Sequence, residues 1–292
     1  MKSPVIKALF VTFLWSTSWI LIKLGIENIP PLLFAGMRYF IAFVVLYVIT
    51  KKHKPFKKVS KRGLYWIMLY GAVMIALTQG AQFVALSILP TILVSLSLNA
   101  TPVVVALFGY WILKEKLVGF QWVGMFLYVI GIGMYFYPFA KIDDLFIGLV
   151  VAVCAVAFNS AATIIGRYVN QQNFLPSIQL TMISMFVGSV LLLSVGLSLE
   201  TFPSLDIKEI VILLWLGIVN TAFAFTLWNQ SLSKLTAISA SLINSTMMIQ
   251  IAMLAWIFLG ESLATRQWIA VFIVFLGVVL VQVLKQRINT EN

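Results

Sequence analysis

Long apolar runs separated by short polar connections are the feature that most constrains this chain of 292 residues. A helix pairs its backbone N–H and C=O groups internally and needs about 20 mainly apolar residues to cross ~30 Å of hydrocarbon. Only 10% of the residues are charged, against roughly a quarter in an ordinary soluble domain. The sequence therefore predicts an all-α integral membrane protein and excludes a soluble enzyme or nucleic-acid binder.

Ten runs of this kind predict ten transmembrane helices. Their expected bounds are residues 5–26, 32–49, 64–86, 91–113, 120–137, 145–166, 177–199, 207–228, 237–259 and 267–283. The first run is too long for a typical signal-peptide core and lacks a small-residue cleavage pattern, so we expect it to be retained. Cys154 is the single cysteine and lies within a run, so no disulfide framework and no metal or cofactor site is predicted.

The distribution of Lys and Arg predicts which way the chain crosses the membrane. With the N-terminus inside, the inner segments hold fifteen cations and the outer segments four, with Arg38 left inside the second span. The inner cations are Lys2, Lys7, Lys51, Lys52, Lys54, Lys57, Lys58, Lys61, Arg62, Lys114, Lys116, Arg167, Lys234, Lys285 and Arg287. The positive-inside rule then predicts that both termini are cytoplasmic, and explains the net charge of +11 without nucleic acid.

An internal repeat becomes visible when the chain is shifted by 146 positions. Residues 71–131 then align with residues 217–277 without a gap, and a Leu-x-Glu-x-Leu-x-x-x-Gln-Trp pattern starts at Leu113 and again at Leu259. We expect two five-helix units, residues 1–140 and 141–292. Because each has an odd number of spans, the second enters the bilayer from the opposite side. Inverted repeats around a site at the bilayer midplane are typical of secondary transporters.

Polar and aromatic side chains within the spans are the candidates for lining a central cavity. Buried polar groups cost free energy unless they are paired, so amides and hydroxyls far from both span ends indicate either a wet pocket or hydrogen bonds between helices. The aromatic neighbours suit a mostly apolar ligand site. The candidate substrate-binding residues are Trp15, Ser16, Trp19, Arg38, Gln79, Gln82, Phe83, Asn99, Asn159, Asn220, Phe225, Trp228, Asn244 and Gln250.

Four charged residues have alternative roles. Arg38 is expected to meet a substrate carboxylate or a carbonyl or amide of the protein, or to reach the outer interface with its long side chain. Lys23 is expected to extend to the membrane interface. Glu115 and Glu261 are expected to cap the N-termini of the helices that follow them.

Several motifs resemble those of the drug/metabolite transporter superfamily, specifically its ten-span bacterial EamA-type permeases. They are residues 14–19 (LWSTSW), residues 22–25 (IKLG), Pro30-Pro31 leading to Arg38-Tyr39, Pro102, the two Leu-x-Glu-x-Leu turns, and Gln121-Trp122-x-Gly124. The second unit departs from the pattern with Ala270 opposite Gly124 and Met248 opposite Pro102. The resemblance covers nearly the whole chain. It implies two five-helix bundles around a central cavity in a bacterial plasma membrane, and export of amino acids or related small metabolites.

Other functions would require residues of other kinds within the spans. An intramembrane enzyme needs a nucleophile with a base, paired carboxylates or metal ligands within the spans, and none is found. A nucleotide-sugar or sugar-phosphate antiporter needs more cavity cations than Arg38 and Lys23, and a lipid scramblase or scaffold stays open as an alternative. The expected partners are a small-molecule substrate and the lipid bilayer, without nucleic acid, and a monomer is compatible with the sequence. No Asp or Glu lies near the centre of a span and His53 lies in a connection, which favours facilitated diffusion or exchange over proton coupling.

Overall fold

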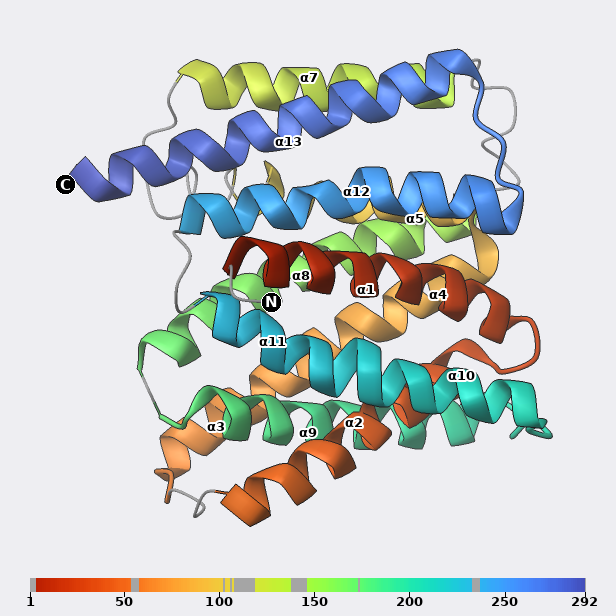
Figure 1. The fold of residues 1–292 in the computed structure, drawn as a ribbon, viewed down its shortest axis with the longest axis vertical. Helices are drawn as coiled ribbons and strands as arrows, with labels where there is room; N and C mark the ends of the chain where they lie inside the picture. The colour runs from red at the N-terminus through yellow and green to blue at the C-terminus, as the bar shows by residue number, and fades with distance from the viewer. Residues whose placement is uncertain are drawn as a thin grey trace.

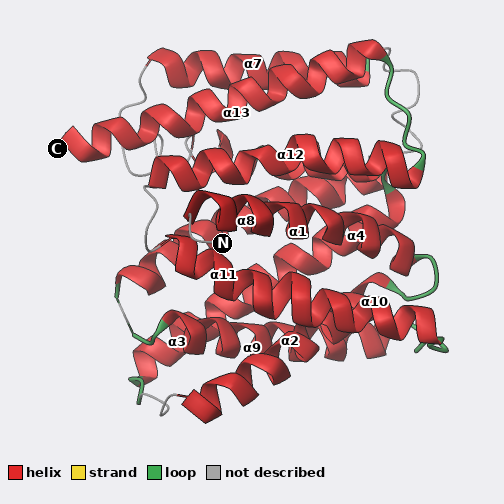
Figure 2. Cartoon of the chain, in the orientation of Figure 1, coloured by secondary structure: helices red, strands yellow, loops and turns green. Residues whose placement is uncertain are grey.

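The computed structural model of the chain is a bundle of roughly parallel and antiparallel helices (Figures 1 and 2). It describes residues 4–53, 58–101, 103–105, 107, 119–137, 146–172, 174–232 and 237–291. The elements of these residues are helical: α1 (Pro4–Ile26), α2 (Pro31–His53), α3 (Lys61–Gly71), η1 (Ala72–Gln79), α4 (Gly80–Ile88), α5 (Thr91–Leu98), α7 (Gly119–Phe136), α8 (Phe146–Gln171), α9 (Ser177–Leu199), α10 (Ile207–Gly217), η3 (Ile218–Phe223), α11 (Ala224–Leu232), α12 (Ala237–Leu259) and α13 (Thr265–Glu291).

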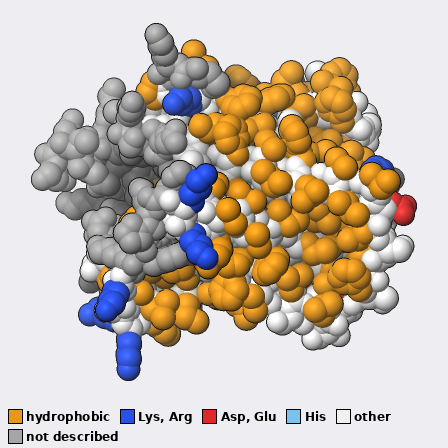
Figure 3. Space-filling model, turned by 60° about the horizontal axis from the view of Figure 1, so that its bottom comes forward, with side chains coloured by type: hydrophobic (Ala, Val, Ile, Leu, Met, Phe, Trp, Pro, Cys, Tyr) orange, Lys and Arg blue, Asp and Glu red, His pale blue; other side chains and the backbone are white. Residues whose placement is uncertain are grey.

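Six continuous helices in the described residues are long and apolar enough to cross a membrane: Pro4–Ile26, Pro31–Lys52, Lys61–Ile88, Phe146–Gly166, Ser177–Leu199 and Ile207–Trp228. Four shorter apolar helices accompany them, at Thr91–Val105, Gly119–Tyr135, Ile243–Leu259 and Thr265–Leu280. Figure 3 shows a broad band of hydrophobic side chains between the two ends of the bundle, with Lys and Arg gathered toward the left. The predicted membrane character of the chain is therefore confirmed.

Helix boundaries recur with the spacing of the sequence repeat. The helices α9, α10, η3, α12 and α13 each begin 146 residues after α2, α3, η1, α5 and α7, respectively. The agreement includes a π-helical stretch, η1 or η3, at the same place within the third and the eighth predicted span. Because π-helices are rare, this recurrence indicates a shared backbone geometry in the two units.

Helices of the two predicted units pack against each other throughout the bundle. The closest partners are α2 with α9, α1 with α12, and α7 with α13, and η1 lies against α8 and α9. In Figure 1, α7 and α13 form one edge of the bundle, and α2, α3 and α9 form the opposite edge. The main hydrophobic core joins α1, α2, α4, α8 and α9, and a second core joins α1, α5, α7, α12 and α13.

Small residues allow α7 and α13 to approach closely, as is common between membrane helices. A Cβ atom on Gly277 would lie 2.6 Å from the carbonyl oxygen of Gly124 and 2.8 Å from the backbone N of Tyr128. Gly131, its counterpart 146 residues earlier, is held equally tightly by Val274. The contact is between backbones, so neither helix can yield by rotating a side chain.

Gly277→Ala is expected to destabilise the protein by roughly 1–3 kcal/mol, because the added methyl group forces α13 away from α7. Gly133→Ala on α7 is the matched control, since its Cβ atom would have no neighbour within 4 Å. Thermal unfolding of the detergent-solubilised protein should show a lower midpoint for Gly277→Ala alone. Equal midpoints for the two variants would contradict the close backbone contact.

Candidate functional site

A break in α5 lies in the middle of the fourth predicted span. The helix ends at Leu98, Asn99 and Ala100 form a turn, and helical structure resumes at Thr101. The residue after Thr101 is proline, which has no N–H to donate to the carbonyl of Leu98 four positions earlier. The hydroxyl of Thr101 donates to that carbonyl instead, at 2.8 Å. The break therefore follows from the Thr-Pro pair and leaves polar backbone at mid-span.

Two predicted amides lie at this break. The Nδ2 of Asn99 donates to the carbonyl of Ser95 at 2.8 Å, and the Nδ2 of Asn159 on α8 donates to the hydroxyl of Thr101 at 3.0 Å. Both asparagine side chains are only partly buried. The break thus connects α5 to α8 and retains amide oxygens for further hydrogen bonds. Broken helices of this kind line the substrate sites of many secondary transporters.

Five more of the predicted residues gather around α1. The ring of Trp15 lies 5.2 Å, centroid to centroid, from both Phe225 and Trp228 on α11. The neighbouring Ser16 faces α12, and its hydroxyl lies 2.9 Å from the Oε1 of Gln250. The Nε2 of Gln250 donates to the hydroxyl of Thr246 at 3.1 Å. We group these residues with the α5 break under the name α1–α5 site, because α1 and α12, which carry Trp15, Ser16 and Gln250, each contact α5.

The remaining predicted residues lie elsewhere. Gln79 accepts a hydrogen bond of 2.8 Å from the hydroxyl of Tyr39, which joins η1 to α2. Trp19 and Phe83 are buried in the main core, where the Phe83 ring packs edge-on against Phe34 at 5.5 Å. Gln82 is also buried, whereas Asn244 is exposed on α12. The residues predicted to bind substrate therefore include side chains of the α1–α5 site and side chains that pack helices against each other.

Arg38 and Asn220 belong to the second kind in this conformation. The Nε of Arg38 donates to the hydroxyl of Thr221 at 3.0 Å, and the guanidinium lies over the ring of Tyr39. Asn220 is fully buried, and its Nδ2 donates to the carbonyl of Leu14 and to the hydroxyl of Ser18. Arg38 therefore bonds within the protein, but to a hydroxyl rather than to the expected carbonyl or amide.

Asn220 and Thr221, which make these contacts, lie next to each other in the π-helix η3. In its widened turn the hydroxyl of Thr221 donates to the carbonyl of Leu216, five residues earlier, at 2.7 Å. Thr78 bonds to Val73 in the same way within η1, at 2.8 Å. In η3 the side chains of Asn220 and Thr221 reach α1 and α2, so the eighth predicted span is fixed to the first two. A threonine near the end of each π-helix was a signal that the sequence analysis did not use.

Asn220→Ala is expected to lower stability rather than substrate affinity, because its bonds run to α1. Each hydrogen bond between membrane helices contributes about 0.6 kcal/mol, so the loss of two should cost about 1 kcal/mol. Asn244→Ala serves as the control, since Asn244 is exposed. Thermal unfolding in detergent should separate the two variants, and an unchanged midpoint for Asn220→Ala would place its side chain outside the packing of α1.

Carboxylates that follow α9 and α12 join helices of the two predicted units. Glu261, after α12, accepts hydrogen bonds of 2.7 and 3.0 Å from the backbone N–H groups of Thr91 and Ile92 at the start of α5. Glu200, after α9, accepts bonds of 2.9 and 2.8 Å from Leu32 and Leu33 at the start of α2. A negative charge is favoured at a helix N-terminus, so each carboxylate holds the end of a helix from the other unit.

The structure corrects one expected partner of a charged residue and adds another. Glu261 caps α5 rather than the helix that follows it, where Gln267 bonds the backbone N–H of Ala264 instead. The Nζ of Lys23 donates to the carbonyls of Leu86 and Leu89 at the end of α4, the latter at 2.9 Å, which are partners that the sequence analysis did not name. Glu115 lies outside the described residues. Glu200 was not predicted at all.

Comparison with known proteins identifies the family. The sequence profile of the EamA-like transporter family matches residues 2–137 and again residues 146–283. The chain belongs to the EamA-like transporter family. EamA-like transporters are membrane proteins, so the apolar helices of this one are transmembrane helices and it is a multi-pass transporter of the drug/metabolite transporter superfamily.

Relatives of this EamA-like transporter are also named as transporters. It is 27% identical to an uncharacterized transporter, YoaV, from Bacillus subtilis, with 92% of each chain covered. It is 25% identical to a probable amino-acid metabolite efflux pump of Escherichia coli, covering 78% of this chain and 77% of that protein. A solved crystal structure superimposes with a TM-score of 0.67 at 17% identity and covers 98% of this chain, which supports the fold alone.

Proposed function

We propose that this EamA-like transporter exports small metabolites, namely amino acids, including neutral and aromatic ones, and related compounds, across a bacterial plasma membrane by alternating access. The observation that carries the proposal is the α1–α5 site, which combines three aromatic rings on α1 and α11, the Ser16–Gln250 pair, and a helix break bonded to Asn159. The aromatic rings suit an apolar or aromatic side chain, and the amides suit the polar groups of an amino acid. The relatives named as amino-acid metabolite efflux pumps support the same substrate class.

The proposed architecture is ten spans in two inverted five-helix repeats, residues 1–140 and 141–292, with both termini cytoplasmic. The six long and four shorter apolar helices would make up the ten spans. Two separate matches to the family profile and the recurrence of helix starts after 146 residues support the repeat. The excess of cations in the segments proposed to lie inside supports the orientation.

The contacts between units suggest which side of the pathway is closed. In the proposed orientation the ends joined by Glu200 and Glu261 are the outer ends. Asn28, after α1, adds a hydrogen bond of 2.8 Å to the carboxylate of Glu209 in α10. Opening the α1–α5 site to the outside would separate these partners. We therefore infer that the structure is an outward-closed conformation, and that the carboxylates act as latches released once in each transport cycle.

Transport is proposed to be uncoupled from protons, since the sequence has no Asp or Glu near the centre of any predicted span. With no titrating group at mid-membrane, exchange of labelled for unlabelled substrate should continue at a rate within about twofold when a protonophore collapses the gradient. Counterflow in proteoliposomes measures this rate. Complete loss of counterflow would mean that a titrating site drives the cycle.

The test of the function is direct. A thermal-shift screen of the purified protein against amino acids, nucleosides and sugars identifies ligands, because a ligand that binds the folded protein raises its unfolding temperature. Each ligand found is then tested for saturable flux into proteoliposomes, with empty liposomes as the control. Saturable flux of an amino acid supports the proposal. Stabilisation by nucleotide sugars alone, or lipid scrambling without metabolite flux, would replace it with one of the alternatives.

A further inference from the structure

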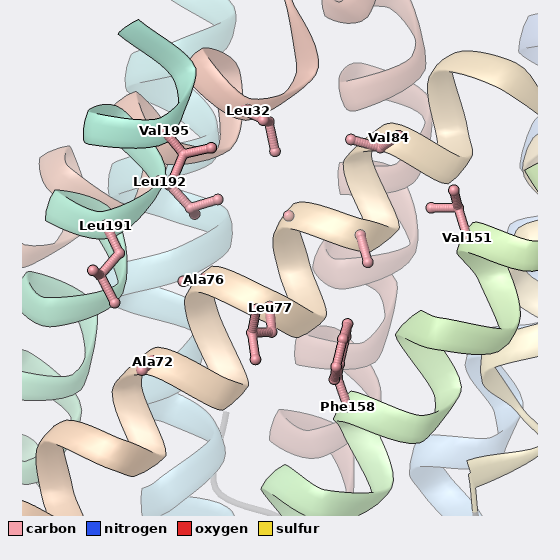
Figure 4. A pocket seen from close by; sticks show the side chains of 12 residues that line it. Leu32, Ala72, Ala76, Leu77, Val84, Val151, Phe158, Leu191, Leu192 and Val195 are labelled. Carbon is pink, nitrogen blue, oxygen red and sulfur yellow. The ribbon is translucent and has the colours of Figure 1, made fainter. Parts of the chain in front are cut away.

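A separate groove opens on the membrane-facing side of the bundle, away from the α1–α5 site. Its volume is about 450 Å³, and its walls come from α2, η1, α4, α8 and α9. Figure 4 shows Ala72 and Ala76 on η1, with Leu191 and Val195 of α9 on one side and Phe158 of α8 on the other. None of the residues predicted from the sequence to bind substrate lines it.

The groove exists because η1 and the start of α4 carry small residues where their neighbours carry large ones. Ala72, Ala76 and Gly80 recur every four positions along one face. Because the side chains on this face are small, they leave a recess between α8 and α9, with η1 and the start of α4 at its base. At Gly80 even one more carbon would lie 2.9 Å from the Cδ2 of Leu192. The recess is thus set by residue size at defined positions rather than by a loose fit of the helices.

The chemistry of the groove selects one kind of occupant. All of its lining residues are apolar, so an amino acid or a water molecule would find no hydrogen-bond partner. Its rim is open to the surroundings, with Leu77, Leu191 and Val195 each more than 40% exposed. These residues lie within the long apolar helices Lys61–Ile88 and Ser177–Leu199, so the surroundings of the rim are membrane hydrocarbon.

We propose that the groove is a binding site for one acyl chain of a membrane lipid. The lining residues run from Ala72 to Val84, which corresponds to ~18 Å along the helix at ~1.5 Å per residue. Half of the hydrocarbon layer is about 15 Å thick, so a chain from one leaflet extends along most of the groove. The seated chain contacts α2, η1 and α4 on one side and α8 and α9 on the other. It therefore fills the seam between the first five predicted spans and the last five.

A photoreactive phospholipid, with a diazirine on one acyl chain, tests this site in proteoliposomes. Adducts mapped by peptide mass spectrometry should concentrate on η1, α4 and α9 around the groove. Ala76→Phe fills the floor with a large side chain and should lower the adduct yield there severalfold. Ala157→Phe is the matched control, because Ala157 is exposed on α8 and does not line the groove, and its yield should equal that of the unmodified protein.

Two outcomes would overturn the proposal: adducts spread evenly over all membrane-facing helices, or a yield at the groove that Ala76→Phe leaves unchanged. If Ala76→Phe does not fold, Ala81→Leu fills the same groove with a smaller change and takes its place. The test does not depend on transport. Loss of metabolite flux without a change in adducts, or the reverse, therefore separates a failure of the proposed function from a failure of the lipid site.

Discussion

Glu261→Gln is expected to slow flux by at least about tenfold and to expose the outer side of the pathway. The carboxylate accepts two backbone N–H groups at the start of α5, and a hydrogen bond to a charged group contributes about 1.5–3 kcal/mol. The amide keeps a single acceptor, turns an N–H donor toward the second backbone N–H, and loses the charge favoured at that helix end. Since about 1.4 kcal/mol corresponds to a factor of ten, losing one such bond shifts the equilibrium away from the outward-closed conformation by about that factor.

The accessibility of an introduced cysteine measures this shift. Ser95 is buried one turn into α5, so Ser95→Cys, in a Cys154→Ser background, should react slowly with a membrane-impermeant thiol reagent added outside. Adding Glu261→Gln should raise the reaction rate. Glu27→Gln is the control, because Glu27 is an exposed glutamate at the same end of the bundle. If the two glutamine variants react alike, the carboxylate of Glu261 is a helix cap with no part in gating.

Sequence periodicity and internal similarity predicted the helices well because both are properties of local sequence. For example, α2 and α9 begin within a few residues of the first residues of the expected spans. The π-helices could not be predicted in the same way. The side chain of Ile75 in η1, for example, packs against Gly188 of α9, and contacts between residues so far apart in the chain are set only once the bundle assembles.

Polar residues in the spans show the limit of the sequence more clearly. Ser16 and Asn220 have similar burial and chemistry, yet Ser16 lies in the α1–α5 site beside Gln250, while Asn220 bonds to the backbone of α1. The free-energy cost of an unpaired polar group predicts that each has a partner, but not which one. The same holds for Lys23 and Glu261, whose partners lie more than 60 and 160 residues away, respectively, in the chain.

Trp228→Ala is expected to reduce flux through the α1–α5 site by about tenfold, with little change in expression. Trp228 is partly buried and packs at a tilt against Trp15, which in turn contacts Phe225. An aromatic pair contributes roughly 0.5–1.5 kcal/mol beyond the area that it buries, so a substrate that loses this ring loses about that much binding free energy. Initial rates of flux over a range of substrate concentrations should show a raised half-saturation concentration.

Trp215→Ala provides the matched control, since Trp215 lies in the same predicted span and is 50% exposed on the membrane-facing side of α10. It changes the same residue type at a position that cannot meet a substrate in the α1–α5 site. A rise in the half-saturation concentration for Trp228→Ala alone places the substrate beside α1 and α11. Equal kinetics for the two variants would move the site away from these residues, toward Gln79 on η1 and Gln82 on α4. Gln79→Leu and Gln82→Leu would then be the variants that reduce flux.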